Sequence, residues 1–147
     1  MTGNILRISE AASLGLHAAG LLGWRVGQRL STGEIARILG GSEAHLSKVM
    51  QRLHRAGIVD STRGPGGGFR LARPAGRITM LEVYEAVEGP LGEAGCLLGR
   101  SLCGGNCMLG DLLQDVHRRF SRRLAETTLA ELAVLFEGAA TGETQRR

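Results

Sequence analysis

Apolar side chains recur every three or four residues in the first third of the chain, which is the spacing of one face of an α-helix. The first run of this kind predicts a helix over residues 10–22, with Ser9 as its N-cap. The next run predicts a short helix that begins at the capping-box sequence 31–34 and ends at the paired glycines 40–41. The N-terminal part of the chain is therefore expected to be helical.

A third run predicts a helix over residues 42–56, capped by Ser42 and ended by Gly57. Its apolar positions are Leu46, Val49, Met50 and Leu53. Its other face is polar and cationic and carries His45, Ser47, Lys48, Gln51, Arg52 and Arg55. Two short helices joined by a glycine turn, the second with a cationic face, are typical of a helix-turn-helix.

The periodicity then changes to that of β-strands. Residues 58–62 and 69–72 alternate apolar and polar positions, and the glycine-rich segment between them must turn, so a β-hairpin is predicted. Its tip reads Arg63-Gly64-Pro65-Gly66-Gly67-Gly68-Phe69. A phosphate-cradling nucleotide loop would need a helix directly after the glycines, whereas a strand is predicted here. A flexible tip without a function is the remaining alternative.

The helix and the hairpin together suggest binding to double-stranded DNA. On the helix, the expected base readers are His45, Ser47 and Lys48, with Gln51 reaching further and with Arg52 and Arg55 suited to phosphates. In the hairpin, the backbone at Gly64, Gly66 and Gly67 can lie against a sugar–phosphate wall while Arg63 enters the minor groove. A merely solvated cationic face is the alternative for the helix alone, and the hairpin arginine favours DNA binding.

The second half of the chain combines helices with one irregular segment. A capping box at 79–82 starts a short helix that ends at Gly89–Pro90. Residues 89–110 are rich in glycine and lack periodicity, so a loop is predicted. Helical spacing returns over residues 109–136, where a further capping box at 128–131 is a potential break. The apolar stripe of this long helix is expected to be buried against a second copy of the chain, or alternatively against its own head.

A length of 147 residues is enough for one domain with a hydrophobic core of moderate size and an additional segment. We expect a mainly α fold with a small β-hairpin: a winged helix-turn-helix head (1–78), a segment with a short helix, a cysteine loop and a long dimerisation helix (79–137), and a disordered tail (138–147). The net charge of +4 and the crowded arginines of the middle segment favour a polyanionic partner. With no membrane span and no secretory signal in the sequence, the expected compartment is the cytoplasm.

The sequence contains three cysteines, all in the predicted loop: Cys96, Cys103 and Cys107. An odd number without an export signal argues against a disulfide framework and favours metal binding or redox chemistry. An iron–sulfur cluster takes four protein ligands, of which these thiolates supply three. A thiol switch, a zinc site without a fourth ligand and idle thiols are the alternatives.

Catalysis has no candidate machinery in this sequence. Paired carboxylates, a Ser-His-Asp set and a thioredoxin-like cysteine pair are all missing, so an enzyme with a small-molecule substrate is not expected.

Four features together resemble the Rrf2 family of transcription regulators over residues 5–135: the stretch 61–69, the glycine-ended helix before it, the three-cysteine loop and the segment 128–132. The Arg-Gly-Pro-Gly-Gly-Gly-aromatic sequence is the most specific of them. The resemblance implies a homodimer paired through its C-terminal helices, with one winged helix per subunit. It also implies a [2Fe–2S] or [4Fe–4S] cluster that modulates binding to operator DNA, and a repressor is the expected form of the regulator.

The cysteine loop departs from the usual family pattern. Its cysteines are separated by six and then three residues, whereas five and five is usual. Some family members have a histidine three residues after the last cysteine, where this chain has Gly110, and others use an acidic residue of the partner's first helix, at a position near Ser13 here. The fourth ligand is therefore left open between Asp111, Ser13, His17 from the neighbouring subunit, and a small molecule.

Overall fold

A computed structural model describes residues 8–92, 96 and 102–142 of the chain. The helices are α1 (Glu10–Trp24), α2 (Thr32–Leu39), α3 (Glu43–Arg55), α4 (Met80–Glu88), α5 (Met108–Glu126) and α6 (Leu129–Gly142), with a short 3₁₀ turn, η1, at Ala75–Arg77. Strands β1 (Val59–Thr62) and β2 (Gly68–Leu71) form an antiparallel hairpin. The predicted fold class, mainly helical with a small hairpin, is confirmed. Among the described helices, none combines the length and the apolar character needed to cross a membrane.

Side-chain caps set the helix boundaries. The Ser9 hydroxyl accepts a hydrogen bond from the Ala12 N–H, and Ser31 and Glu34 form a reciprocal capping box at the start of α2. The bond from the Ser31 backbone N–H favours the charged carboxylate and so lowers the pKa of Glu34. The predicted caps of the first four helices are confirmed: Ser9, Ser31, Ser42 and Thr79.

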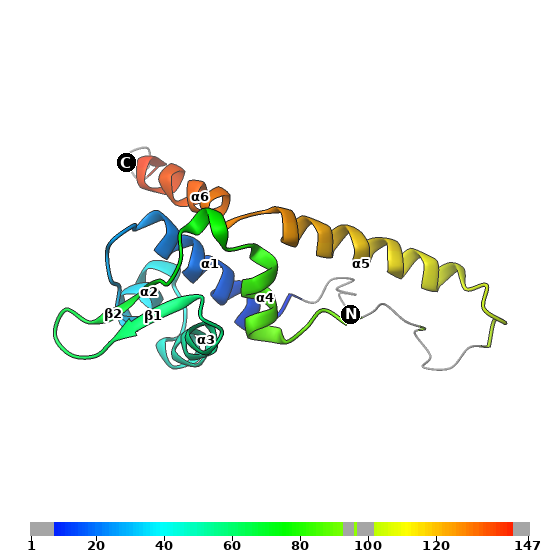
Figure 1. The fold of residues 1–147 in the computed structure, drawn as a ribbon, viewed down its shortest axis with the longest axis horizontal. Coiled ribbons are helices and arrows are strands. Elements are labelled where there is room, and N and C mark those ends of the chain that lie inside the picture. Colours follow the sequence, from blue (N-terminus) through cyan, green and yellow to red (C-terminus); the bar gives the residue numbers. More distant parts are fainter. Residues whose placement is uncertain (1–7, 93–95, 97–101, 143–147) are drawn as a thin grey trace.

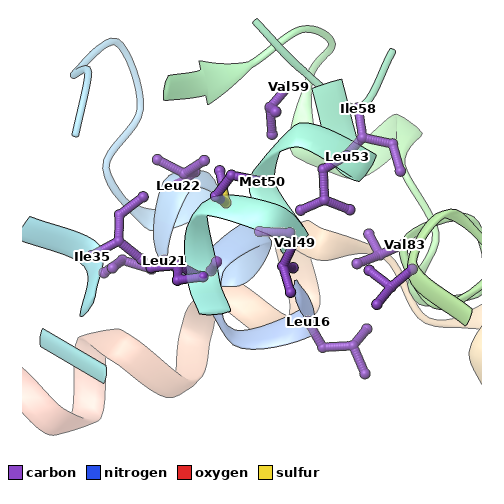
Figure 2. Packing of buried hydrophobic residues seen from close by; sticks show 14 of the residues in the cluster. Leu16, Leu21, Leu22, Ile35, Val49, Met50, Leu53, Ile58, Val59 and Val83 are labelled. Atoms are coloured by element: carbon purple, nitrogen blue, oxygen red, sulfur yellow. The ribbon is translucent and has the colours of Figure 1, made fainter. Parts of the chain in front are cut away.

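Helix α1 lies at the centre of the head, and α3, α4 and α6 pack around it (Figure 1). Leu21 of α1 and Met50 and Leu53 of α3 have no exposed surface. Figure 2 shows the apolar side chains of these two helices gathered in one cluster. Because each such side chain contributes about 1.5–3 kcal/mol on burial, the apolar face of α3 holds the helix to the head and leaves its polar face outside.

The hairpin is joined to the head by more than its own two strands. Val59 pairs with Leu71 at its base, and Thr62 pairs with Gly68 next to the tip. The Leu30 N–H also donates to the Phe69 carbonyl at 3.0 Å, and the Phe69 N–H donates to the Leu30 carbonyl at 2.8 Å. A single β-bridge at Leu30 therefore joins the segment that leads into α2 to the outer edge of β2.

Helix α5 extends away from the head, whereas α6 lies against α1 (Figure 1). One long helix with a potential break at 128–131 was predicted, and the break is present, because the Thr128 and Glu131 side chains form a capping box at the start of α6. The part of the predicted dimerisation helix that lies in α6 therefore packs against its own head. The tail was predicted to be disordered from Gly138, and this is wrong for its first residues, because the helix continues to Gly142. Residues 143–147 of the predicted tail lie outside the described part of the chain.

Candidate functional site

The outer face of α3 is open to solvent. Lys48, Gln51 and Arg55 are exposed, and the apolar residues between them are buried in the head. The helical period alone produces this division, because residues three and four positions apart share a face. Three long polar side chains therefore project from one surface of the head, as the sequence predicted.

A hollow of about 370 Å³ separates this face from the hairpin. It is lined by Gln51, His54, Ser61, Thr62, Arg63, Gly68 and Phe69. The structure thus brings Gln51 of α3 and Arg63 of the hairpin tip to the two sides of one depression, although twelve positions separate them in the sequence. A surface with donors on a helix and a cation on a neighbouring hairpin matches the docking geometry of winged-helix proteins on DNA.

The glycines of the hairpin tip are required by the backbone itself. A Cβ on Gly67 would lie 2.3 Å from the Thr62 carbonyl oxygen, and a Cβ on Gly68 would lie 2.5 Å from the Leu30 carbonyl oxygen. Gly68 also has φ +134°, which side chains rarely adopt. These two glycines therefore have a structural reason to be present, whether or not Gly67 touches DNA.

We expect Gly68→Ala to destabilise the head and displace the hairpin. The strained φ alone costs about 1–3 kcal/mol, and the clash with the Leu30 carbonyl adds to it. Urea unfolding measures the change, and Gly92→Ala is the control, because Gly92 has open space around it and no positive φ. Equal unfolding midpoints for the two variants would show that the hairpin tolerates a side chain at position 68.

Two of the predicted DNA-binding residues also have partners inside the protein. The Arg52 Nη1 donates to the Val87 carbonyl at 2.7 Å and so joins α3 to α4. The His45 Nδ1 lies 3.7 Å from a carboxylate oxygen of Glu10. Contacts of Arg52 with phosphate and of His45 with bases remain predictions, as do those of Ser47, which is half-buried.

Two further residues lie at this surface: His54, which was expected to be a surface or phosphate-facing residue, and Arg29, which sequence reasoning missed. His54 lines the hollow, and its Nδ1 lies 3.0 Å from the Val59 carbonyl oxygen. The Arg29 Nη1 donates to the Gly68 carbonyl at 3.3 Å and so links the segment before α2 to the start of β2. The position of His54 follows from its spacing of three from Gln51, but no local signal links Arg29 to a glycine 39 positions away.

The predicted cysteine ligands surround a second hollow, of about 190 Å³, at the start of α5. It is lined by Cys96, Cys103, Gly105, Cys107, Gly110, Asp111 and Gln114. Cys96 and Cys103 are exposed, and Cys107 is the N-cap of α5, where its sulfur accepts a hydrogen bond from the Gly110 N–H at 3.2 Å. The structure therefore brings all three cysteines to one place, while residues 97–101 of the loop lie outside its described part.

The three thiolates of this hollow fit an iron–sulfur cluster, for which cysteines are the usual ligands. Within the described ranges, no three Cys, His, Asp or Glu side chains form a group that could hold one metal ion. A cluster distributes its thiolate ligands over two or more irons, so it takes cysteines arranged around a wider space. The Gly110 N–H···S bond is also of the type that tunes cluster potentials.

A family model for Rrf2, described as an iron-dependent transcriptional regulator, matches residues 8–134. The chain is 37% identical over 101 residues to the HTH-type transcriptional regulator IscR of Xenorhabdus nematophila, covering 67% of this chain and 61% of that protein, so it spans less than two thirds of this relative. Its fold is similar to CymR, the global cysteine regulator of B. subtilis (27% identity, 88% of this chain and 98% of that chain, TM-score 0.76). It is also similar to T. potens IscR (25% identity, 97% of this chain and 93% of that chain, TM-score 0.70). These relatives are regulators and not enzymes, and the chain belongs to the Rrf2 family of transcriptional regulators.

Proposed function

We propose that the protein is a homodimeric, DNA-binding transcription regulator in the cytoplasm. The observation that carries the proposal is the pairing of Gln51 and Arg63 across one hollow between α3 and the hairpin. This surface fits a duplex, with α3 in the major groove and the hairpin tip over the adjacent minor groove. Repression follows if the operator overlaps a promoter.

In this proposal, the residues that contact DNA divide into two groups. Base edges are read by His45, Ser47, Lys48 and Gln51. The sugar–phosphate backbone and the minor groove are contacted by Arg52, Arg55, Arg63, Gly64, Gly66 and Gly67. The division supports sequence-specific binding, because phosphate contacts position the protein and base contacts select the site.

The apolar face of α5 supports the homodimer. Leu109 and Leu112 are 58% and 59% exposed in the single chain, and Met108 is 86% exposed. Because α5 extends away from the head, these apolar side chains find little of their own subunit's core to pack against. The same side chains of a second copy would bury them. Two heads then present two α3 helices to successive half-sites of an operator.

We further propose that Cys96, Cys103 and Cys107 hold an iron–sulfur cluster that controls DNA binding. When bound, the cluster would supply one-electron redox chemistry and sensitivity to oxidants. Cys107 is both a proposed ligand and the N-cap of α5, so the state of the loop bears directly on the first turn of the helix that pairs the subunits. That connection supports coupling between the loop and the spacing of the two heads.

A thiol switch is the second candidate. It is supported by the exposure of Cys96 and Cys103 beside one hollow and by the similarity to S. aureus CymR, for which a structure of an oxidized form is known. In this case a peroxide would take two electrons from two thiols, which lose their protons and form a disulfide. No metal would then be needed.

Anaerobic purification of the full chain tests the proposal. Preferred DNA is first selected from a pool of random duplexes, and the affinity is then measured for the wild type and for Cys103→Ala. We expect a brown protein that contains iron and sulfide, both lost in Cys103→Ala, together with a change of about tenfold or more in affinity for the selected DNA. A colourless protein whose affinity responds reversibly to peroxide and thiol supports the second candidate. If the protein prefers no duplex sequence over the others, the proposal of a sequence-specific regulator is excluded.

A further inference from the structure

We propose that Asp111 is the fourth protein ligand of the cluster, bound through a carboxylate oxygen; this inference rests on the cluster of the proposed function. Asp111 lines the same hollow as all three cysteines, and it is the only carboxylate among the described residues that does so. Carboxylate oxygens are iron ligands in other protein sites, so Asp111 can supply the donor that three thiolates leave missing. The cysteines alone leave one position of the set open.

The position of Asp111 on α5 explains why it reaches the cysteines. It lies four residues after Cys107, the N-cap of α5, and both residues line the hollow at the start of this helix. It also stands in the first turn of α5, where the helix dipole stabilises anionic groups. A negatively charged donor beside the Cys107 sulfur is therefore favoured by the helix itself.

Gly110, between these two residues, gives the space for this arrangement. It has no side chain to offer as a ligand, and a Cβ at this position would lie 3.3 Å from the Cys107 Cβ and 3.5 Å from its sulfur. The first of these contacts is tight, so a side chain at position 110 would crowd Cys107. Its N–H donates to the same sulfur. Position 110 thus serves the site through its backbone, and the next residue supplies the side chain.

The other candidate donors of the same chain either lie outside the hollow or are weaker iron ligands. Ser13 and His17 lie on α1, where the His17 Nδ1 is 2.7 Å from the Ser13 carbonyl oxygen, and neither lines the hollow. Gln114 lines it, but its neutral amide is a weaker iron ligand than a carboxylate. Asp115 forms an ion pair with Arg118 and does not line it. The described residues therefore favour Asp111.

The test compares full-length wild type, Asp111→Asn, Asp111→Cys and Asp115→Asn, each purified without oxygen. Iron and sulfide content, visible absorption and circular dichroism, Mössbauer spectra and the rate of iron release to a chelator are measured. We expect Asp111→Asn to change the spectra and to release iron about tenfold faster or more, the range for loss of an interaction that supports a metal site. Asp111→Cys should restore retention with a more thiolate-like spectrum, which a purely structural role would not produce.

Asp115→Asn is the matched control, because it removes the same charge one turn further along α5 and should behave as wild type. Far-ultraviolet circular dichroism establishes that each variant is folded. If the wild type holds iron and sulfide and Asp111→Asn matches it in every spectrum and in release rate, Asp111 is not a ligand and the cluster stands. If the wild type itself holds neither iron nor sulfide, the cluster of the proposed function fails first.

Discussion

Replacing Leu109 and Leu112 together with glutamate is expected to convert the proposed dimer into a monomer and to lower operator affinity about 10²- to 10⁴-fold, the range for losing the second of two linked binding events. Both side chains are more than half exposed in the single chain. Four charges facing one another across a paired stripe would be buried without partners, which strongly opposes association. The head does not depend on these residues, because its core lies elsewhere.

Sedimentation measures the oligomeric state, and DNA titration measures the operator affinity. Arg122→Gln is the control: it also makes the helix more negative, but its position lies on another face of α5 and it should remain dimeric. A double-glutamate variant that sediments as a dimer would place the subunit interface elsewhere. A monomer with unchanged operator affinity would instead contradict the two-half-site arrangement.

Removal of the Arg63 side chain at the hairpin tip should have the next largest effect on operator affinity. We expect Arg63→Ala to weaken operator binding by about 1–3 kcal/mol and to reduce the slope of log affinity against log salt by about one unit per subunit. Arg63 is exposed at the edge of the hollow shared with α3, so its loss leaves the fold intact. Fluorescence anisotropy at several salt concentrations gives both quantities.

Lys48→Ala provides the contrast, because Lys48 is an exposed cation of α3 and a predicted base reader. Its loss should alter the preference among operator sequences and not weaken all duplexes equally. If Arg63→Ala leaves both affinity and salt slope unchanged, the hairpin does not contact DNA. If Lys48→Ala weakens all duplexes equally, Lys48 contacts only the backbone.

Features that depend on local chemistry were predictable from the sequence. The caps at Ser9, Ser31, Ser42 and Thr79 use residues within four positions, and the hairpin has a strand period on each side of a glycine turn. The break before α6 follows from its own capping box. Each of these elements is determined by neighbours in the chain, which is why the pattern alone identifies it.

Features that join distant segments were not predictable. The bond from Arg52 to the Val87 carbonyl spans 35 positions, and the pairing of Leu30 with Phe69 spans a similar distance. The extension of α6 to Gly142 was missed because its last turns combine small residues with glycine, which indicate helix only weakly in isolation. For the cysteine site, several candidates for the fourth ligand follow from the sequence, and the fold adds that Asp111 lines the same hollow as the three cysteines of its own chain.

The backbone pairing of Leu30 with Phe69 has a consequence for how the protein would choose its sites. It ties β2 to the segment that leads into α2, so we expect the hairpin to keep a set position relative to the helix-turn-helix. A fixed distance between α3 and the hairpin tip would not fit a duplex whose grooves are too wide or too narrow. The DNA would then have to deform, at a cost in binding free energy. Base pairs that no side chain touches would therefore influence affinity through the stiffness of the duplex.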